Sequence, residues 1–348
     1  MKNVALFMIL MLAAGLVTLV LIRSEPATPT AFNGSTMGTT YTVRLAREMP
    51  GEQQKIWQAR VQKCLDDINA RMSTYQSDSE VSRFNRSAST DWFPVSRQTA
   101  LVVQTALQVS EQTRGAFDVT VDPLVNLWNF GPERRPLGIP TDAEIEAARA
   151  TVGYQHLSVR VAPPALRKAF PKLTIDLSGI AKGFAVDRIG RLLEQGGIGP
   201  YMVEVGGEVR TRGTKNNGAP WRIGIEQPVS GQRLLEGVLE LEDIALATSG
   251  DYRNFFEWNG QLYSHAIDPR AGGPVTHGVA AVSVLAPTAM RADAYATGLM
   301  VLPPEEAWGV AKDLGLEIMV VIRGREGCRR RATPGFSSRM QEVKRGAR

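Results

Sequence analysis

The sequence predicts an α+β protein with a mostly antiparallel sheet flanked by helices. Helical periodicity is concentrated early and late in the chain, whereas short strands separated by turns dominate between about residues 201 and 285. The 348 residues are 43% hydrophobic, which is enough for a substantial core in one large or two modest domains. No internal repeat interrupts this pattern.

Each element follows from a local pattern of residues. Alternation predicts a strand at 40–45, and helical spacing predicts helices at 52–72 and at 99–114, the second closed by Gly115. A capped helix start is expected near 140–145, whereas the Pro- and Lys-rich residues 163–172 are expected to form a loop. Strands are then expected at 201–205, 209–213, 221–226, 237–240, 245–248, 263–267 and 279–285, helices at 288–301 and 304–314, and a last strand at 317–322.

The most informative run extends from Asp176 to Gly183 and reads Asp-Leu-Ser-Gly-Ile-Ala-Lys-Gly. The apolar residues 173–175 predict a strand before it, and the amphipathic residues 184–193 predict a helix after it. A helix N-terminus with unpaired N–H groups suits phosphate, and Lys182 adds a full charge there. Taken alone, the run is equally compatible with an ordinary strand-to-helix joint that carries a solvated lysine.

Three later segments favour a ligand site. A Thr-Ser-Gly run at 248–250 offers small hydroxyls and a permissive backbone, and His265 precedes an Asp-Pro-Arg turn. Asp293 and Thr297 are four residues apart on a predicted helix, so both place hard oxygen ligands on one face. Singly, such a pair is more often a local hydrogen-bonded pair, and a lone histidine is more often structural; their joint occurrence carries the argument.

Taken in order, these segments resemble the ApbE family of flavin transferases. The resemblance runs from about Phe32 to Phe336. It also includes Gly-Ser-Thr-Met-Gly-Thr-Thr-Tyr at 34–41, Met-Ser-Thr-Tyr at 72–75 with Ser-Glu-Val-Ser-Arg-Phe-Asn at 79–85, Gly-Ala-Phe-Asp-Val-Thr at 115–120, and Val-Gly-Gly-Glu at 205–208. It implies an ApbE-like α+β fold and transfer of FMN from FAD to a Ser or Thr hydroxyl of an acceptor protein, with release of AMP.

The family also implies roles for individual residues. Residues at flavin-contacting or phosphate-contacting positions are Met37, Tyr75, Ala116, Phe117, Asp118, Asp176, Lys182 and His265. His265 is the candidate base, because an imidazole titrates near neutrality, and Asp293 shares the catalytic role through a metal. Mg²⁺, with Mn²⁺ as the alternative, is expected at the carbonyls of Gly179 and Met290 and at the side chains of Asp293 and Thr297.

Two other functions use the same residues. An FAD pyrophosphatase would replace the acceptor hydroxyl with water, and a flavin-binding protein would not turn FAD over at all.

The resemblance implies acceptors that carry an Asp-Gly-x-Ser/Thr-Gly-Ala-type motif, as in subunits of Rnf- or Nqr-type redox complexes or periplasmic reductases. The chain itself lacks that motif, so it is expected to be the transferase and not its own substrate.

The ends of the chain predict its location. Residues 4–22 form an uncharged, mostly apolar run of 19, so residues 1–23 are expected to be a membrane anchor or a signal, followed by a linker at 24–31. The transferase domain is expected at 32–336 and a basic tail at 337–348, with the domain on the periplasmic side of the cytoplasmic membrane. The net charge of +5 arises from a local excess of +7 after residue 322, a tail property that does not indicate nucleic-acid binding.

Overall fold

The computed structural model describes residues 29–342 except 134, 137, 229–234, 252–254 and 325–326. Its centre is an eight-stranded sheet in the order β1-β2-β6-β7-β10-β15-β16-β17, with every neighbouring pair antiparallel. These strands are β1 (Thr30–Thr36), β2 (Thr39–Leu45), β6 (Tyr201–Val205), β7 (Glu208–Arg212), β10 (Ala245–Gly250), β15 (Val279–Ala286), β16 (Glu317–Gly324) and β17 (Gly327–Ala332). The predicted α+β class with a mostly antiparallel sheet is confirmed.

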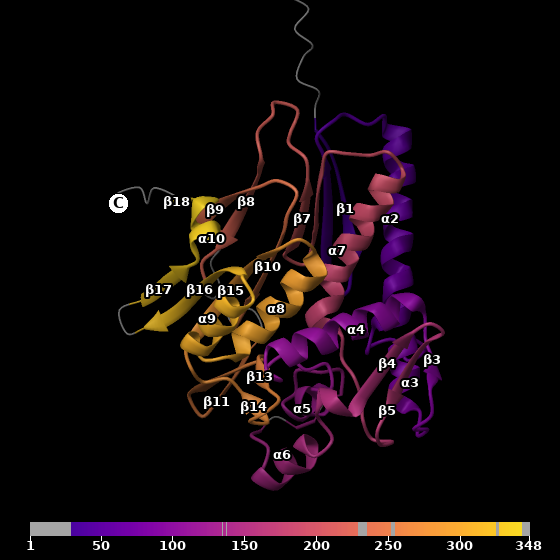
Figure 1. Ribbon diagram of the computed structural model, residues 1–348, viewed down its shortest axis with the longest axis vertical. Helices are drawn as coiled ribbons and strands as arrows, with labels where there is room; N and C mark the ends of the chain where they lie inside the picture. Colours follow the sequence, from indigo (N-terminus) through magenta and orange to yellow (C-terminus); the bar gives the residue numbers. More distant parts are fainter. Residues whose placement is uncertain are drawn as a thin grey trace, which may run out of the picture.

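Helices flank this sheet (Figure 1). They are α2 (Gly51–Met72), α3 (Glu80–Arg86), α4 (Arg97–Gln112), α5 (Asp122–Leu127), α6 (Asp142–Arg149), α7 (Ser178–Gln195), α8 (Ala289–Val301), α9 (Pro304–Asp313) and α10 (Pro334–Ser338). Smaller sheets join β3 (Phe93–Pro94), β5 (Pro164–Lys168) and β4 (Leu157–Val161), and join β18 (Met340–Glu342), β9 (Leu235–Leu241) and β8 (Trp221–Glu226). Two hairpins are β11 (Phe255–Trp258) with β12 (Gln261–Ser264), and β13 (Ile267–Asp268) with β14 (Gly273–Pro274).

Both faces of the central sheet are covered by other elements, and this explains why its strand β15 is so rich in apolar residues. Every residue of β15 is buried, and alternate side chains join different cores. Val282 and Val284 face the core beneath α7 and α8, whereas Ala281 and Leu285 pack toward the β8–β9–β18 sheet. Because a strand alternates its side chains between faces, a strand that is buried on both sides is expected to be mostly apolar, and the one polar residue of β15, Ser283, is hydrogen-bonded to Thr248.

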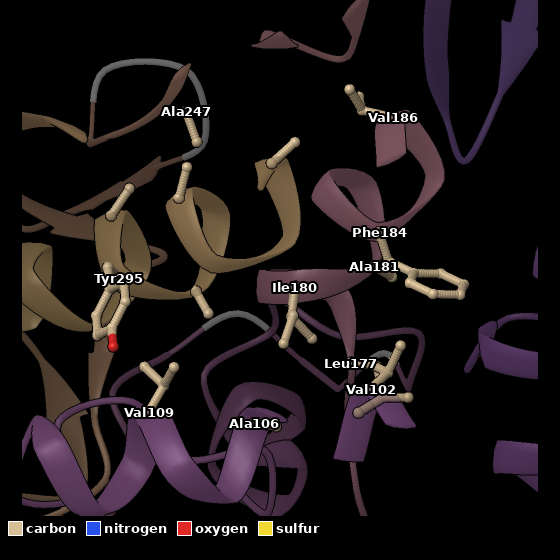
Figure 2. Packing of buried hydrophobic residues seen from close by; sticks show 14 of the residues in the cluster. Val102, Ala106, Val109, Leu177, Ile180, Ala181, Phe184, Val186, Ala247 and Tyr295 are labelled. Carbon is tan, nitrogen blue, oxygen red and sulfur yellow. The ribbon is translucent and has the colours of Figure 1, made fainter. Parts of the chain in front are cut away.

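The larger core joins α4, α7 and α8 (Figure 2). Val102, Ala106 and Val109 of α4 are buried in the same cluster as Ile180 of α7 and Tyr295 of α8. Apolar residues at this helical spacing place one face of α4 against two other helices. The packing fixes the start of α7 and the middle of α8 relative to each other.

The contact between α7 and α8 is unusually close at Gly183. A Cβ atom there would lie 2.2 Å from the carbonyl oxygen of Ala289 and 2.8 Å from Cβ of Asp293. From α7, the buried Asp187 accepts hydrogen bonds from the N–H groups of Ala289 (3.1 Å) and Met290 (3.0 Å). The Asp187 side chain of α7 therefore caps the N-terminus of α8.

Replacing Gly183 with alanine is expected to destabilise the fold by roughly 1–3 kcal/mol, because the added methyl group must separate α7 from α8. Chemical denaturation measures the change. Gly309→Ala is the matched control, since nothing lies within 4 Å of a Cβ at that helical position. The control is expected to gain up to about 1 kcal/mol from helix propensity. Equal stabilities of the two variants would contradict the close packing described.

Several predicted elements differ from the structure. Residues 163–172 are not a simple loop, because β5 pairs with β4 across 157–168. Residues 173–175 belong to no strand; instead, the side chain of Asn85 accepts from the N–H of Ile175 and donates to its C=O, both at 2.9 Å. The predicted strand at 263–267 is interrupted at His265, between β12 and β13.

The anchor or signal, the linker and the basic tail were predicted at the two ends of the chain. The anchor or signal at 1–23 and most of the linker at 24–31 lie outside the described residues. At the other end, residues 337–342 complete α10 and form β18, which pairs with β9. Within residues 29–342, as far as they are described, no helix is both long and apolar enough to span a bilayer.

Candidate active site

A cavity of about 770 Å³ lies where the start of α7, the middle of the sheet and the 115–121 loop meet. Nine of the twelve predicted site residues line it: Tyr75, Ala116, Phe117, Asp118, Asp176, Gly179, Lys182, His265 and Thr297. Met37, Met290 and Asp293 do not line it. The structure therefore brings most of the predicted site together around one space.

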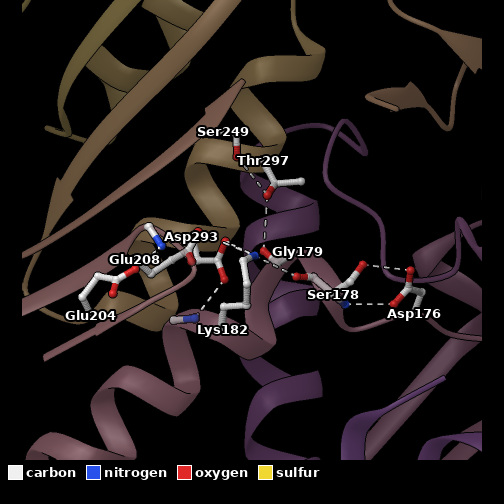
Figure 3. A network of polar contacts seen from close by, with 11 residues as sticks. Asp176, Ser178, Gly179, Lys182, Glu204, Glu208, Ser249, Asp293 and Thr297 are labelled. Atoms are coloured by element: carbon white, nitrogen blue, oxygen red, sulfur yellow. Dashed lines mark hydrogen bonds and ion pairs between the residues drawn. The ribbon is translucent and has the colours of Figure 1, made fainter. Parts of the chain in front are cut away.

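The turn before α7 is held in place from several directions. The N–H of Asp176 donates to the carbonyl of Val119 at 2.7 Å. Its two carboxylate oxygens accept from the N–H and the hydroxyl of Ser178, each at 2.9 Å (Figure 3). Burial raises the pKa of Asp176, although these hydrogen bonds and the charge of Lys182 oppose that shift. Asp176 therefore organises the N-terminus of α7 as well as facing the cavity.

Lys182 lies between two buried carboxylates (Figure 3). Its Nζ is 3.6 Å from Oε1 of Glu208 and 3.7 Å from Oδ1 of Asp293, and it donates to the carbonyl of Ser178 at 3.3 Å. The Glu208 and Asp293 side chains are 4% and 2% exposed, so both depend on this cation for compensation. In this arrangement the lysine is 28% exposed toward the cavity and paired with both acids, unlike a freely solvated surface lysine.

Lys182, Glu208 and Asp293 form a triad in which one of the two carboxyl groups is favoured in its protonated, neutral form. Burial raises the pKa of Asp293, and burial together with the Asp293 charge raises the pKa of Glu208 to about 8, against the opposing effect of Lys182. The two carboxylates hold the pKa of Lys182 above its ordinary value. Two acids that share a single cation cannot both ionise at low cost in a buried site.

Glu208→Gln is expected to change how stability depends on pH. A carboxyl group whose pKa rises from 4.5 to about 8 on folding favours its neutral form, so ionisation destabilises the fold as pH rises through that window. The glutamine variant stays neutral, and its melting temperature relative to the parent should therefore increase from about pH 5 to about pH 9. Thermal unfolding across this range measures the effect; a constant difference would contradict the raised pKa.

Neutral oxygen atoms gather beside the triad. The hydroxyl of Thr297 donates to the carbonyl of Gly179 at 3.4 Å and lies 3.3 Å from the hydroxyl of Ser249. A Cβ at Gly179 would be 3.1 Å from Thr297 and 3.2 Å from Phe117. Glycine at this position therefore allows the start of α7 to lie close to both side chains. Asp293 lies one helical turn before Thr297, as the sequence spacing predicted.

This donor set fits a hard cation. No three His, Cys, Asp or Glu side chains converge on a metal position within the described ranges. A cation here would therefore combine the Asp293 carboxylate with neutral oxygens, and Mg²⁺ accepts such ligands. The side chain of Met290 is partly buried, and its N–H donates to Asp187. Nothing in the contacts of Met290 places its carbonyl at the oxygen cluster.

The predicted flavin-contacting residues occupy different parts of the site. Tyr75 is 71% exposed at the rim, whereas Ala116 and Phe117 are buried. Asp118 is also buried, and its carboxylate accepts from Thr120 and from the N–H of Tyr154. This carboxylate therefore closes the 115–120 loop, a structural role that the sequence did not indicate.

Met37 lies at the tip of the β1–β2 hairpin rather than on the cavity wall. Met37 and Gly38 both have positive φ (50° and 69°), as in the tight turns that join antiparallel strands. The side chain packs partly against the larger core, and Thr39 and Thr40 beside it do line the cavity. Met37 is thus adjacent to the site.

His265 is the one histidine among the described residues that lines the cavity. It follows β12, and its ring lies 6.3 Å from the ring of Phe130 at an interplanar angle of 68°. The neighbouring Ser264 hydroxyl accepts from the N–H of Ala266, which turns the chain at this point. His265 and Lys182 therefore face the same cavity from different elements.

Sequence reasoning missed the residues that support the site. Asn85 holds Ile175, Asp187 caps α8, and the ammonium group of the buried Lys168 donates to the carbonyls of Asn85, Pro171 and Leu173. A lysine inside an apolar run is the signal that could have indicated such a contact. Glu208 was noted as part of a motif, but its contact with Lys182 depends on tertiary packing.

The fold and the site together define a protein that binds a phosphate-bearing ligand between a helix N-terminus and the middle of an antiparallel sheet. A family model for the ApbE family matches residues 37–320. The chain is 44% identical to an FAD:protein FMN transferase of Vibrio cholerae over 90% of its length and 93% of that protein. It is 41% identical to one of Salmonella typhimurium, covering 91% of each chain. The chain belongs to the ApbE family.

Solved structures agree with this assignment. The flavin transferase ApbE from Vibrio cholerae superposes with a TM-score of 0.83 at 44% identity, covering 90% of this chain and 99% of that one. The apo form of the Pseudomonas stutzeri flavinyl transferase ApbE gives a TM-score of 0.82 at 38% identity, covering 91% and 98%. The predicted resemblance is therefore confirmed in both sequence and fold.

Proposed function

We infer that this protein is an FAD:protein FMN transferase, an enzyme that moves FMN from FAD to an acceptor protein. The observation that carries this inference is the arrangement in one cavity of an α7 N-terminus, the Lys182 ammonium group and the oxygen cluster around Thr297. These are the groups that transfer at a diphosphate requires, because negative charge must be stabilised where the bond breaks. The relatives that match over nine tenths of the chain bear this name.

The reaction balances as a substitution at phosphorus. The oxygen of an acceptor Ser or Thr forms a bond to the phosphorus of the FMN half, the anhydride bond breaks, and AMP leaves with the bonding electron pair. The hydroxyl proton passes to the imidazole of His265, which lines the same cavity. Lys182 and the N–H groups at the start of α7 bind and orient the phosphates.

A divalent cation completes this proposal. Asp293 and Thr297 would hold Mg²⁺ together with the carbonyl of Gly179, whose distance from the Thr297 hydroxyl is 3.4 Å. When bound, the ion supplies a Lewis acid that neutralises charge on the phosphates. For the ion to take Asp293, the Lys182 ammonium group must give up part of its contact with that carboxylate. Mn²⁺ is the alternative ion.

The acceptor and the location are also part of the proposal. Acceptors would carry an Asp-Gly-x-Ser/Thr-Gly-Ala-type motif, as expected for Rnf- or Nqr-type subunits or periplasmic reductases. The apolar run at 4–22 supports attachment to the cytoplasmic membrane with the transferase domain in the periplasm. Fractionation of cells, with protease added to intact spheroplasts, tests this: a domain on the periplasmic side is digested, and a cytoplasmic one is protected.

AMP release measured with and without acceptor tests the function. A transferase releases one AMP for each FMN attached and releases little AMP when the acceptor hydroxyl is absent. An FAD pyrophosphatase would release AMP and free FMN at the same rate without acceptor, and a binding protein would release neither. Either of the last two results would overturn the proposal.

A further inference from the structure

Strand β10 continues past the end of its neighbour β7. It pairs with β15 over all six residues, from Ala245 to Gly250. On its other side it pairs with β7 at Ala245 and Leu246 alone, because β7 begins at Glu208. Within the described part of the chain, the second half of β10 therefore has a sheet partner on one side only.

The alternation of an antiparallel strand tells which backbone groups face the open side. The carbonyl of Ile244 accepts from Thr211 on the β7 side, and the N–H of Asp251 donates to Ala280 on the β15 side. Successive residues direct their N–H and C=O groups to opposite neighbours. Thr248 and Gly250 therefore direct theirs to the side where β7 has ended, and no described residue pairs with them there.

The open edge faces the cavity, and so does a second strand edge. Leu246, Thr248 and Gly250 line the cavity. Strand β8 is the outer strand of the β18–β9–β8 sheet, and its residues from Ile223 to Glu226 line the cavity as well. Two strand edges thus bound one space, which is the geometry that accommodates an added extended chain.

This edge lies next to the proposed reaction centre. The hydroxyl of Ser249 is 3.3 Å from that of Thr297, within the oxygen cluster. Glu208, which is 3% exposed and lines the cavity, is the first residue of β7, beside the point where the β10 edge opens. Its Oε2 atom has no hydrogen-bond partner in the described protein. Unpaired buried oxygens are rare in folded proteins, and this one can accept a hydrogen bond from a donor of a bound segment.

We propose that the acceptor protein binds as an extended strand on the free edge of β10, pairing with Thr248 and Gly250 beside the oxygen cluster of Ser249 and Thr297. The inference rests on the function proposed above. Donors and acceptors are both unpaired along this edge, so a phosphate, which only accepts at its anionic oxygens, would satisfy half of them. The outward-facing backbone groups of Thr248 and Gly250 are two residues apart, about 7 Å along the strand. This distance exceeds the length of one nucleobase edge, whereas it matches the two-residue repeat of an extended peptide.

A backbone scan of the acceptor tests this without altering the enzyme. A synthetic acceptor peptide is N-methylated at one position at a time on either side of the reactive Ser or Thr, and KM is measured for each with the full-length enzyme. N-methylation at alternate positions is expected to raise KM by about tenfold or more. The positions between them point away from β10 and serve as matched controls, with changes of about twofold or less.

The outcomes separate the two proposals. Labelling of the unmodified peptide reports the transferase function itself, whatever the scan shows. If that peptide is labelled but the scan shows no alternation, the strand-addition proposal is overturned and the function stands. If only a folded acceptor is labelled, the proposal is also overturned, since a strand edge requires no more than the segment. If no acceptor is labelled, the function fails and the docking proposal with it.

Discussion

Asp293→Ala is expected to reduce FMN transfer by at least about a thousandfold at saturating FAD. The change removes the carboxylate proposed as a cation ligand and leaves Glu208 as the remaining ion-pair partner of Lys182 among the described residues. It also removes the acceptor of the Gly183 N–H, at a cost of about 1–3 kcal/mol in stability. Initial rates of acceptor labelling measure the loss.

Asp293→Asn is the matched control for this variant. The asparagine side chain can still accept from the N–H of Gly183, so α7 and α8 should remain joined while the negative charge is lost. Transfer should fall nearly as far as in the alanine variant, whereas the unfolding free energy should fall less. Isothermal titration with Mn²⁺ should show weakened binding in both variants. Full activity in either variant would show that Asp293 is not a ligand of a cation that transfer requires.

His265→Ala is expected to abolish most transfer while FAD still binds. Removing a general base lowers a rate by about 10²–10⁴-fold, and His265 lines the cavity without taking part in the Lys182 triad. FAD affinity, measured by quenching of flavin fluorescence, should change by less than about threefold. Transfer rates at rising pH should show partial recovery, because an acceptor hydroxyl loses its proton more readily to solvent base.

His156→Gln is the control for a histidine outside the cavity. The ring of His156 packs edge-on against Phe170, 5.2 Å between centroids, and does not line the cavity. This variant should transfer FMN at close to the parent rate. If both histidine variants lost activity equally, or if His265→Ala retained it, the assignment of His265 as base would be wrong.

Much of the fold could be predicted from patterns of apolar residues, and the exceptions have identifiable causes. Strand β15 was predicted because all its residues except Ser283 are apolar, and α4 because its apolar residues recur at helical spacing. Strand β17 was missed because its Cys-Arg-Arg-Arg sequence is exposed at a sheet edge, where side chains need not alternate. Strand β5 was missed because it contains Lys168, whose ammonium group is buried among the carbonyls of Pro171 and Leu173 just after it and of the distant Asn85.

The site was predictable where it depends on local spacing and not where it depends on tertiary packing. Asp293 and Thr297 lie on one face of α8, and Gly179 meets Thr297, as the motifs implied. That Lys182 bridges Glu208 and Asp293 could not be predicted, since Glu208 is the first residue of β7 and reaches Lys182 only through tertiary packing. Asp118 has a structural role for the same reason, because Tyr154 is distant in sequence.

The most direct test of the account is in-gel flavin fluorescence of an acceptor protein after incubation with the full-length chain, FAD and Mg²⁺. The account predicts a fluorescent acceptor band that survives denaturation and disappears when the acceptor Ser or Thr is replaced by alanine. Omission of the metal should remove the band as well. Free FMN and AMP without a labelled band, or FAD that remains unchanged, would contradict the assignment of this chain as an FAD:protein FMN transferase.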